Sequence, residues 1–199
     1  MKRIVFGLLA LLAAGPAMAQ DIQPTPTEVR FIGLFDRFCL SNGGRMAAAL
    51  AAADAEGWVP TPPSFLEPTP GAPVMAGRMS HALVPGGPQP VVLVMSSSPE
   101  GPGQVHVCSV DAHNMETVRL NAVVEMLADR LGIEPVRPRS GPSAAMWVFS
   151  GTGPFADETR LMAGNPGLDV LSTQGRPIYM LSVQMDGPQP AILYFRVGD

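Results

Sequence analysis

Proline and glycine divide this chain of 199 residues into short apolar segments, and this division limits the folds open to it. The chain has 22 prolines and 21 glycines. Between residues 74 and 110 they form the stretches PGGPQP and SPEGPG, which separate apolar runs at 74–84, 91–97 and 104–110. Short turns of this kind join antiparallel strands. The sequence therefore predicts a three-stranded meander, a further strand at 145–150, and a closing hairpin at 178–185 and 191–197.

Three segments have the features of helices. Residues 28–40 place apolar side chains at the i, i+3, i+4 spacing of one helix face. The alanine-rich segment 45–56 ends at Gly57, a typical helix stop. A third apolar stripe lies between a cap at Asn114 and a stop at Gly132, and a short helix is expected at 155–163. The stretch 60–73 is too rich in proline for a helix, so we expect an extended strap there.

These elements predict an α+β fold, with an antiparallel sheet of five to six strands and about three helices packed on one face. Residues 20–199 are long enough for one domain with an adequate core. The tetrapeptide GPQP occurs at 87–90 and at 187–190, each time before an apolar strand. This echo indicates either a duplicated helix-plus-hairpin unit or two hairpins that use proline-rich turns independently.

The first 19 residues have the pattern of a secretory signal peptide. Lys2 and Arg3 precede an uncharged apolar run at 4–14, and Ala17-Met18-Ala19 matches an A-x-A cleavage site. No later run approaches the roughly 20 apolar residues of a membrane span. We therefore expect an exported protein, periplasmic or secreted, with no membrane span in the mature chain.

Export affects the interpretation of the two cysteines. Cys39 lies on the apolar face of the helix expected at 28–40, and Cys108 lies in the strand expected at 104–110. An oxidising compartment favours their pairing, so we predict a disulfide between helix and sheet. The alternative is two separate buried thiols.

The charge of the chain excludes several functions. Its only lysine is Lys2, so the chain without its leader has 11 arginines against 17 acidic residues. An acidic chain lacks the basic face that nucleic acids require, and a chain without lysine cannot form a Schiff base. The remaining partners we consider are another envelope protein or a small ligand.

One set of residues suggests a metal site. Met75, Met79 and His81 share the parity of one strand, with Met95 on the next, and thioether and imidazole ligands suit Cu(I). The alternative is that the methionines fill gaps in the core. A GxGxxA pattern at 151–156 resembles a dinucleotide fingerprint, but Pro154 removes an amide and no long helix follows, so we interpret it as a turn. We expect no cofactor.

Residues for acid–base chemistry are few and scattered. A hydrolase would have to gather two or more of His81, His106, Asp111 and Glu116 in one pocket. The other charged residues considered are expected to be solvated: Asp54, Glu56, Glu125, Asp129, Asp157, Glu158, Arg137 and Arg139. The sequence therefore favours a non-catalytic exported binding or envelope-associated domain, with a periplasmic hydrolase as the alternative.

Overall fold

Eight antiparallel strands form one sheet in the order β1-β2-β3-β4-β8-β7-β5-β6. The computed structural model describes residues 23–63, 66, 74–80, 91–97, 105–111, 118–138, 143–163, 168–186 and 189–198. The strands are β1 (Val59–Pro60), β2 (Val74–Ser80), β3 (Val91–Ser97), β4 (Val105–Asp111), β5 (Ser143–Ser150), β6 (Ala156–Asp157), β7 (Ile178–Asp186) and β8 (Gln189–Val197). The α+β class and all six expected strands are confirmed. The expected count of five to six was too low because β1 and β6 are too short to show an alternating pattern.

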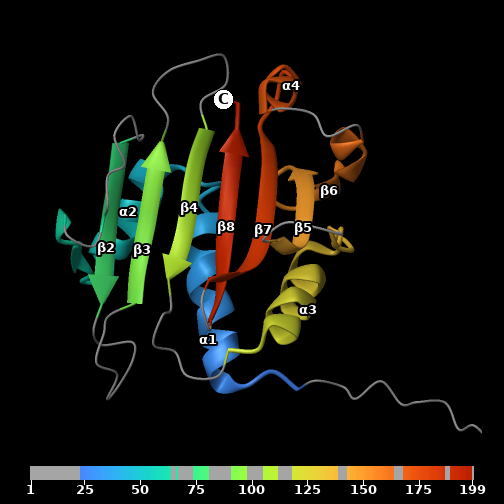
Figure 1. Ribbon diagram of the computed structural model, residues 1–199. Coiled ribbons are helices and arrows are strands. Elements are labelled where there is room, and N and C mark those ends of the chain that lie inside the picture. Colours follow the sequence, from blue (N-terminus) through green and yellow to red (C-terminus); the bar gives the residue numbers. More distant parts are fainter. Residues whose placement is uncertain are drawn as a thin grey trace, which may run out of the picture.

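Three helices lie on one side of the sheet. They are α1 (Pro26–Phe35), which continues as the π-helical turn η1 (Asp36–Leu40), α2 (Met46–Ala55) and α3 (Leu120–Leu131). Figure 1 shows α1 and α2 behind the strands. Contacts of α1 with β4 and α3, of α2 with β2 and β3, and of α3 with β7 and β8 form this layer. A capping box between Thr25 and Glu28, with Pro26 in the first turn, starts α1.

The start of α3 differs from the expectation. The expected cap, Asn114, lies outside the described residues, and the helix begins at Leu120 with Arg119 as its N-cap. The backbone N–H of Arg119 donates to Oε1 of Glu28 at 2.9 Å. A carboxylate 91 residues away in sequence thus holds the residue that precedes the helix. The stop at Gly132 is confirmed, with φ of 66°.

The helix expected at 155–163 is not formed. Ala156 and Asp157 instead make β6, paired with Ser150 and Phe149 of β5, and a 3-10 turn, η3 (Thr159–Met162), follows. The backbone N–H of Glu158 donates to the carbonyl of Val148 at 2.8 Å. Pairing with β5 therefore outweighs the local helical preference. Residues 151–154 form the turn between β5 and β6, as the GxGxxA interpretation predicted.

The main core lies between the helices and the sheet. Its largest buried side chains include Trp147, Tyr194, Phe31, Phe35 and Phe38. A smaller cluster lies on the opposite face, where Leu171 of α4 (Leu168–Ser172) packs with Val148, Ile178 and Val197. The two hairpins that share the GPQP turn differ in position, because β2–β3 adjoins the edge strand β1 whereas β7–β8 lies in the sheet interior.

Candidate binding surface

The predicted disulfide is present. Cys39 of η1 and Cys108 of β4 are bonded, with their Cα atoms 5.6 Å apart, and both residues are fully buried. The bond joins the helical layer to a central strand. Two separate thiols, the alternative interpretation, are therefore excluded. With both cysteines in the bond, neither is a nucleophile or a metal ligand.

The sheet is apolar on both faces, and this is the most unusual feature of its surface. Antiparallel sheets commonly pair an apolar inner face with a polar outer face. On β3, Leu93 and Met95 face the helices, but the alternate positions are Val92 and Val94. On β8, likewise, Tyr194 faces the helices and apolar residues occupy the alternate positions. We call the outward surface of five strands the open face: Met75, Gly77, Met79, Val92, Val94, Ser96, Val105, Val107, Ser109, Met180, Ser182, Gln184, Ala191, Leu193 and Phe195.

The strand register places the bulkiest of these side chains at the centre. Phe195 of β8 pairs with Val107 of β4 and with Met180 of β7. Leu193 pairs with Ser109 and with Ser182. These partners are directly opposite one another and on the same face. A continuous apolar strip thus crosses β4, β8 and β7.

Only one corner of this side of the sheet is covered by described elements. Met180 packs against the smaller cluster, together with Leu161 and Met162 of η3. Among the described helices, α1, α2 and α3 belong to the other side (Figure 1). Gly77 and Ser182 are buried, and the other open-face side chains are half-buried by their neighbours in the sheet.

The open face as defined has no charged residue, and its polar members are Ser96, Ser109, Ser182 and Gln184. Asp111, opposite Val92, and Asp186, opposite Gln189, occupy outward positions at its margin, at the ends of β4 and β7. The helical side and the loops, by contrast, have several ion pairs, among them Arg37–Glu56 and Arg130–Asp36. An uncharged apolar surface on a folded chain is typical of a contact site.

The copper hypothesis finds one element of support and one contradiction. Met75 and Met79 lie on the same face of β2, as predicted, and belong to the open face. Met95 was expected near them, but it pairs with Ala76 and is fully buried on the helical side. His81 lies outside the described residues. In the part of the chain that the structure describes, no three His, Cys, Asp or Glu residues could hold a metal ion.

The acid–base candidates do not converge where they are described. His106 shares the face of Cys108, on the helical side, as its parity predicted. Asp111 occupies a position of the opposite parity on the same strand. His81 and Glu116 lie outside the described residues. The pair that can be compared therefore lies on two sides of the sheet.

Two carboxylates, Glu28 and Glu158, are buried. Glu28 is fully buried, and its carboxylate accepts hydrogen bonds from Nε and Nη2 of Arg119, both at 2.8 Å. These bonds, with those from Thr25, lower the pKa of Glu28 to about 2 against the opposing effect of burial. Glu158 was expected to be solvated, which is wrong. It is 3% exposed, bonds to Ser150, and pairs with Arg176.

The remaining charged candidates lie at the surface. Asp54 forms a two-point pair with Arg78, whose guanidinium lowers the pKa of Asp54. Hydrogen bonds from Thr159 lower the pKa of Asp157. Glu125, Asp129 and Arg137 are exposed, as expected, and Arg139 lies outside the described residues. These groups are accounted for by surface pairing and solvation.

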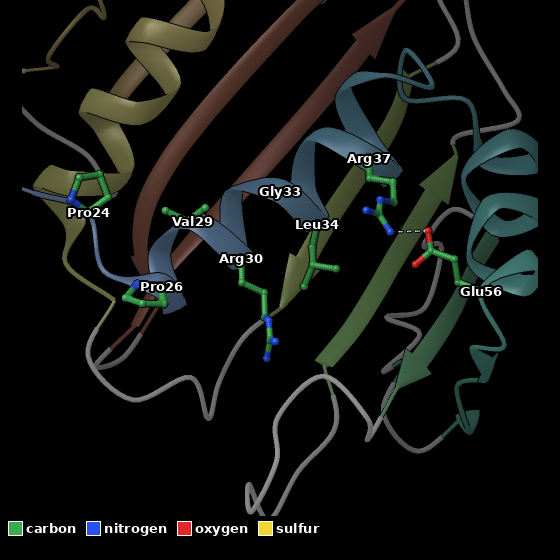
Figure 2. A pocket seen from close by; sticks show the side chains of 8 residues that line it. All are labelled: Pro24, Pro26, Val29, Arg30, Gly33, Leu34, Arg37 and Glu56. Carbon is green, nitrogen blue, oxygen red and sulfur yellow. Dashed lines mark hydrogen bonds and ion pairs between the residues drawn. The ribbon is translucent and has the colours of Figure 1, made fainter.

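A groove of about 530 Å³ follows the outer side of α1. Figure 2 shows Val29, Gly33 and Leu34 along the helix and the Arg37–Glu56 pair bridging to α2, at 2.7 Å. A Cβ atom at Gly33 would contact nothing within 4 Å. The groove is a smaller second candidate surface, with charged residues at its rim. It is lined by Pro24, Pro26, Val29, Arg30, Gly33, Leu34, Arg37 and Glu56.

Comparisons with known proteins give no relative for this chain: no family model, curated protein or solved structure matches it. Among the described residues, no helix combines the length and the apolar composition required to cross a membrane. The candidate site therefore rests on the geometry alone.

Proposed function

We propose that this chain is an exported, non-catalytic binding protein and that the open face is its contact surface. The observation that carries the proposal is the absence of charge from the described outward side chains of five adjacent strands, with Asp111 and Asp186 at the strand ends. Withdrawing such a surface from water is favourable by roughly 25 cal/mol per Å² of apolar area. No buried charge has to be desolvated when a partner covers it.

Two further observations support export. Residues 1–19 have the charge, apolar run and small residues of a signal peptide, although they lie outside the described residues. The Cys39–Cys108 bond suits an oxidising compartment. An envelope-associated binding role agrees with both, and with the acidic composition that argues against nucleic acid.

Binding of the neutral dye Nile red to the folded chain tests the contact surface. The full chain is expressed with its leader, purified from the periplasm, and titrated with dye from about 0.1 to about 100 µM protein, a range that brackets micromolar affinities. We expect Leu193→Glu to reduce dye fluorescence per chain severalfold at the lowest concentration. Met185→Glu is the matched control, because Met185 is 46% exposed and occupies a position of β7 with the parity of the helical side.

The same experiment can contradict the proposal. If Leu193→Glu and the wild type give equal dye signals at every concentration, and neither self-associates, the open face is not a contact surface. If the protein stays in the cytoplasmic fraction with its leader uncleaved, export is contradicted. Circular dichroism of both variants ensures that any difference in dye signal arises in folded protein.

A further inference from the structure

We infer that the occupant of the open face is a second copy of this chain, stacked sheet against sheet; this inference rests on the proposed function. The two open faces would be in contact, with the two sheets about 10 Å apart, the usual spacing of packed sheets. The pairing would be isologous, since each copy contributes the same surface. Four observations favour this occupant over a smaller one.

The first observation is that the sheet edges are protected. A sheet can self-associate by adding strands at its edges or by stacking its faces. Here β1 and β6, each of two residues, form the edges. Pro60 of β1 has no N–H to donate. The backbone N–H of Thr61 donates to the carbonyl of Gly77, so the residue after β1 also pairs with β2. Edges of this kind disfavour strand addition, so face stacking is the available mode.

The second observation is area. Five strands at a spacing of about 4.8 Å and seven residues at a rise of about 3.3 Å cover roughly 550 Å² in projection. The accessible area of a corrugated face exceeds its projection. The open face therefore approaches the roughly 800 Å² per partner of a standard protein interface, which is larger than a small ligand would cover.

The third observation is the distribution of residue types across the face. Phe195 and Leu193 lie on the central strand β8, and valines flank them on β4. Methionines lie toward both sides, Met75 and Met79 on β2 and Met180 on β7. Rigid side chains at the centre can serve as anchors. Flexible thioether side chains at the sides can fill the irregular gaps that two twisted sheets leave between them.

The fourth observation is charge. The chain is acidic, so two copies repel each other through most of their surfaces. At the open face two copies can approach through uncharged side chains, with Asp111 and Asp186 at its margin. A basic partner would instead be expected to meet acidic residues at its binding site, and the open face offers it none in the described side chains.

Sedimentation equilibrium tests the inference with the exported full chain over the concentration range given above. We expect the wild type and Met185→Glu to have twice the mass of one chain at high concentration. Phe195→Glu should remain a single chain, with at least a tenfold weaker self-association. A wild type that stays a single chain throughout overturns the inference. If it still binds Nile red through the open face, the proposed function stands without it.

A second variant keeps the test decisive if Phe195→Glu fails to fold. Ser109→Cys introduces a small thiol beside Leu193 at the centre of the open face. A short bis-maleimide should cross-link this variant between copies. Thr173→Cys, at an exposed position after α4, is the control and should remain uncross-linked. Equal cross-linking of the two variants, or none in Ser109→Cys, contradicts stacking through this face.

Discussion

Glu28 and Arg119 form a two-point ion pair that joins the start of α1 to the start of α3. Both side-chain bonds from Arg119 are 2.8 Å long, and the backbone N–H of Arg119 adds a third bond to the same carboxylate. Glu28 is fully buried, whereas the Arg119 side chain is 46% exposed. One carboxylate therefore completes the capping box of its own helix and positions the residue that precedes another.

Glu28→Gln should destabilise the fold by about 2 kcal/mol. The amide keeps the size of the side chain but loses the charge and one of the acceptors that Thr25 and Arg119 use. Unfolding in urea measures the change. Glu56→Gln, which weakens the more exposed pair with Arg37, is the control and should cost less than about 0.5 kcal/mol. Equal losses of unfolding free energy in the two variants would show that the burial of Glu28 does not make its ion pair more stabilising than an exposed one.

The stability should also depend on pH through Glu28. Its pKa is about 2 in the folded chain and 4.5 without the fold, so the ionised form favours folding. This contribution is fully present above about pH 4.5 and decreases as the pH falls toward 2. Unfolding free energies measured between these limits should fall more steeply in the wild type than in Glu28→Gln. If unfolding free energy changes with pH in the same way in both proteins, the lowered pKa of Glu28 in the folded chain is contradicted.

Arg176 should matter more than Arg160, although both pair with Glu158. Arg176 contacts the buried Oε1, which also accepts from Ser150, while Arg160 reaches Oε2 at 3.5 Å and is 80% exposed. Arg176→Met should therefore cost about 1–2 kcal/mol, because it leaves a buried carboxylate poorly compensated. Arg160→Met should cost less than about 0.5 kcal/mol. Thermal unfolding of the two variants at neutral pH makes the comparison.

Reduction of the Cys39–Cys108 bond should lower stability by about 3 kcal/mol. The bond closes a loop with a sequence separation of 69 residues, which restricts the unfolded chain. Urea unfolding with and without reductant measures the loss. Cys39→Ala with Cys108→Ala, which removes the bond and needs no reductant, should lose a similar amount. An unchanged midpoint in both would contradict a structural role for the bond.

Gly33→Ala should stabilise the fold by about 1 kcal/mol, because glycine is costly inside a helix and the added methyl group meets no atom within 4 Å. Gly77→Ala is the opposite case. A Cβ atom there would lie 2.8 Å from Oγ1 of Thr61 and 2.9 Å from the Leu93 carbonyl. It should be destabilising by more than about 1 kcal/mol. Melting temperatures of the two variants should therefore move in opposite directions.

Elements with strong local signals were predictable from the sequence. The strand at 91–97 was expected with its observed bounds, and the helix expected at 45–56 differs from α2 by one residue at each end. The Cys39–Cys108 pairing followed from compartment and helical periodicity. The signals for the strand and the helix are contained in neighbouring residues, and the chain has only two cysteines to pair, so no knowledge of the tertiary structure was needed.

Features that depend on distant partners could not be predicted. The beginning of α3 is held by Glu28 from another helix. The segment around Ala156 pairs with β5 in place of forming a helix. The open face did have a signal in the sequence, since the run Val91–Met95 is apolar at both parities and indicates a strand with two apolar faces. Which of those faces the described helices leave uncovered depends on where these helices pack.

The position of β8 has a consequence for the order in which the fold can be completed. This strand comes from residues 189–197, yet it lies between β4 and β7 in the middle of the sheet. As the chain emerges during synthesis, β4 and β7 each lack a neighbour until these residues arrive. A chain shortened before residue 189 would contain two incomplete sheets with unpaired inner edges. The native sheet therefore closes last at its centre, not at its margins.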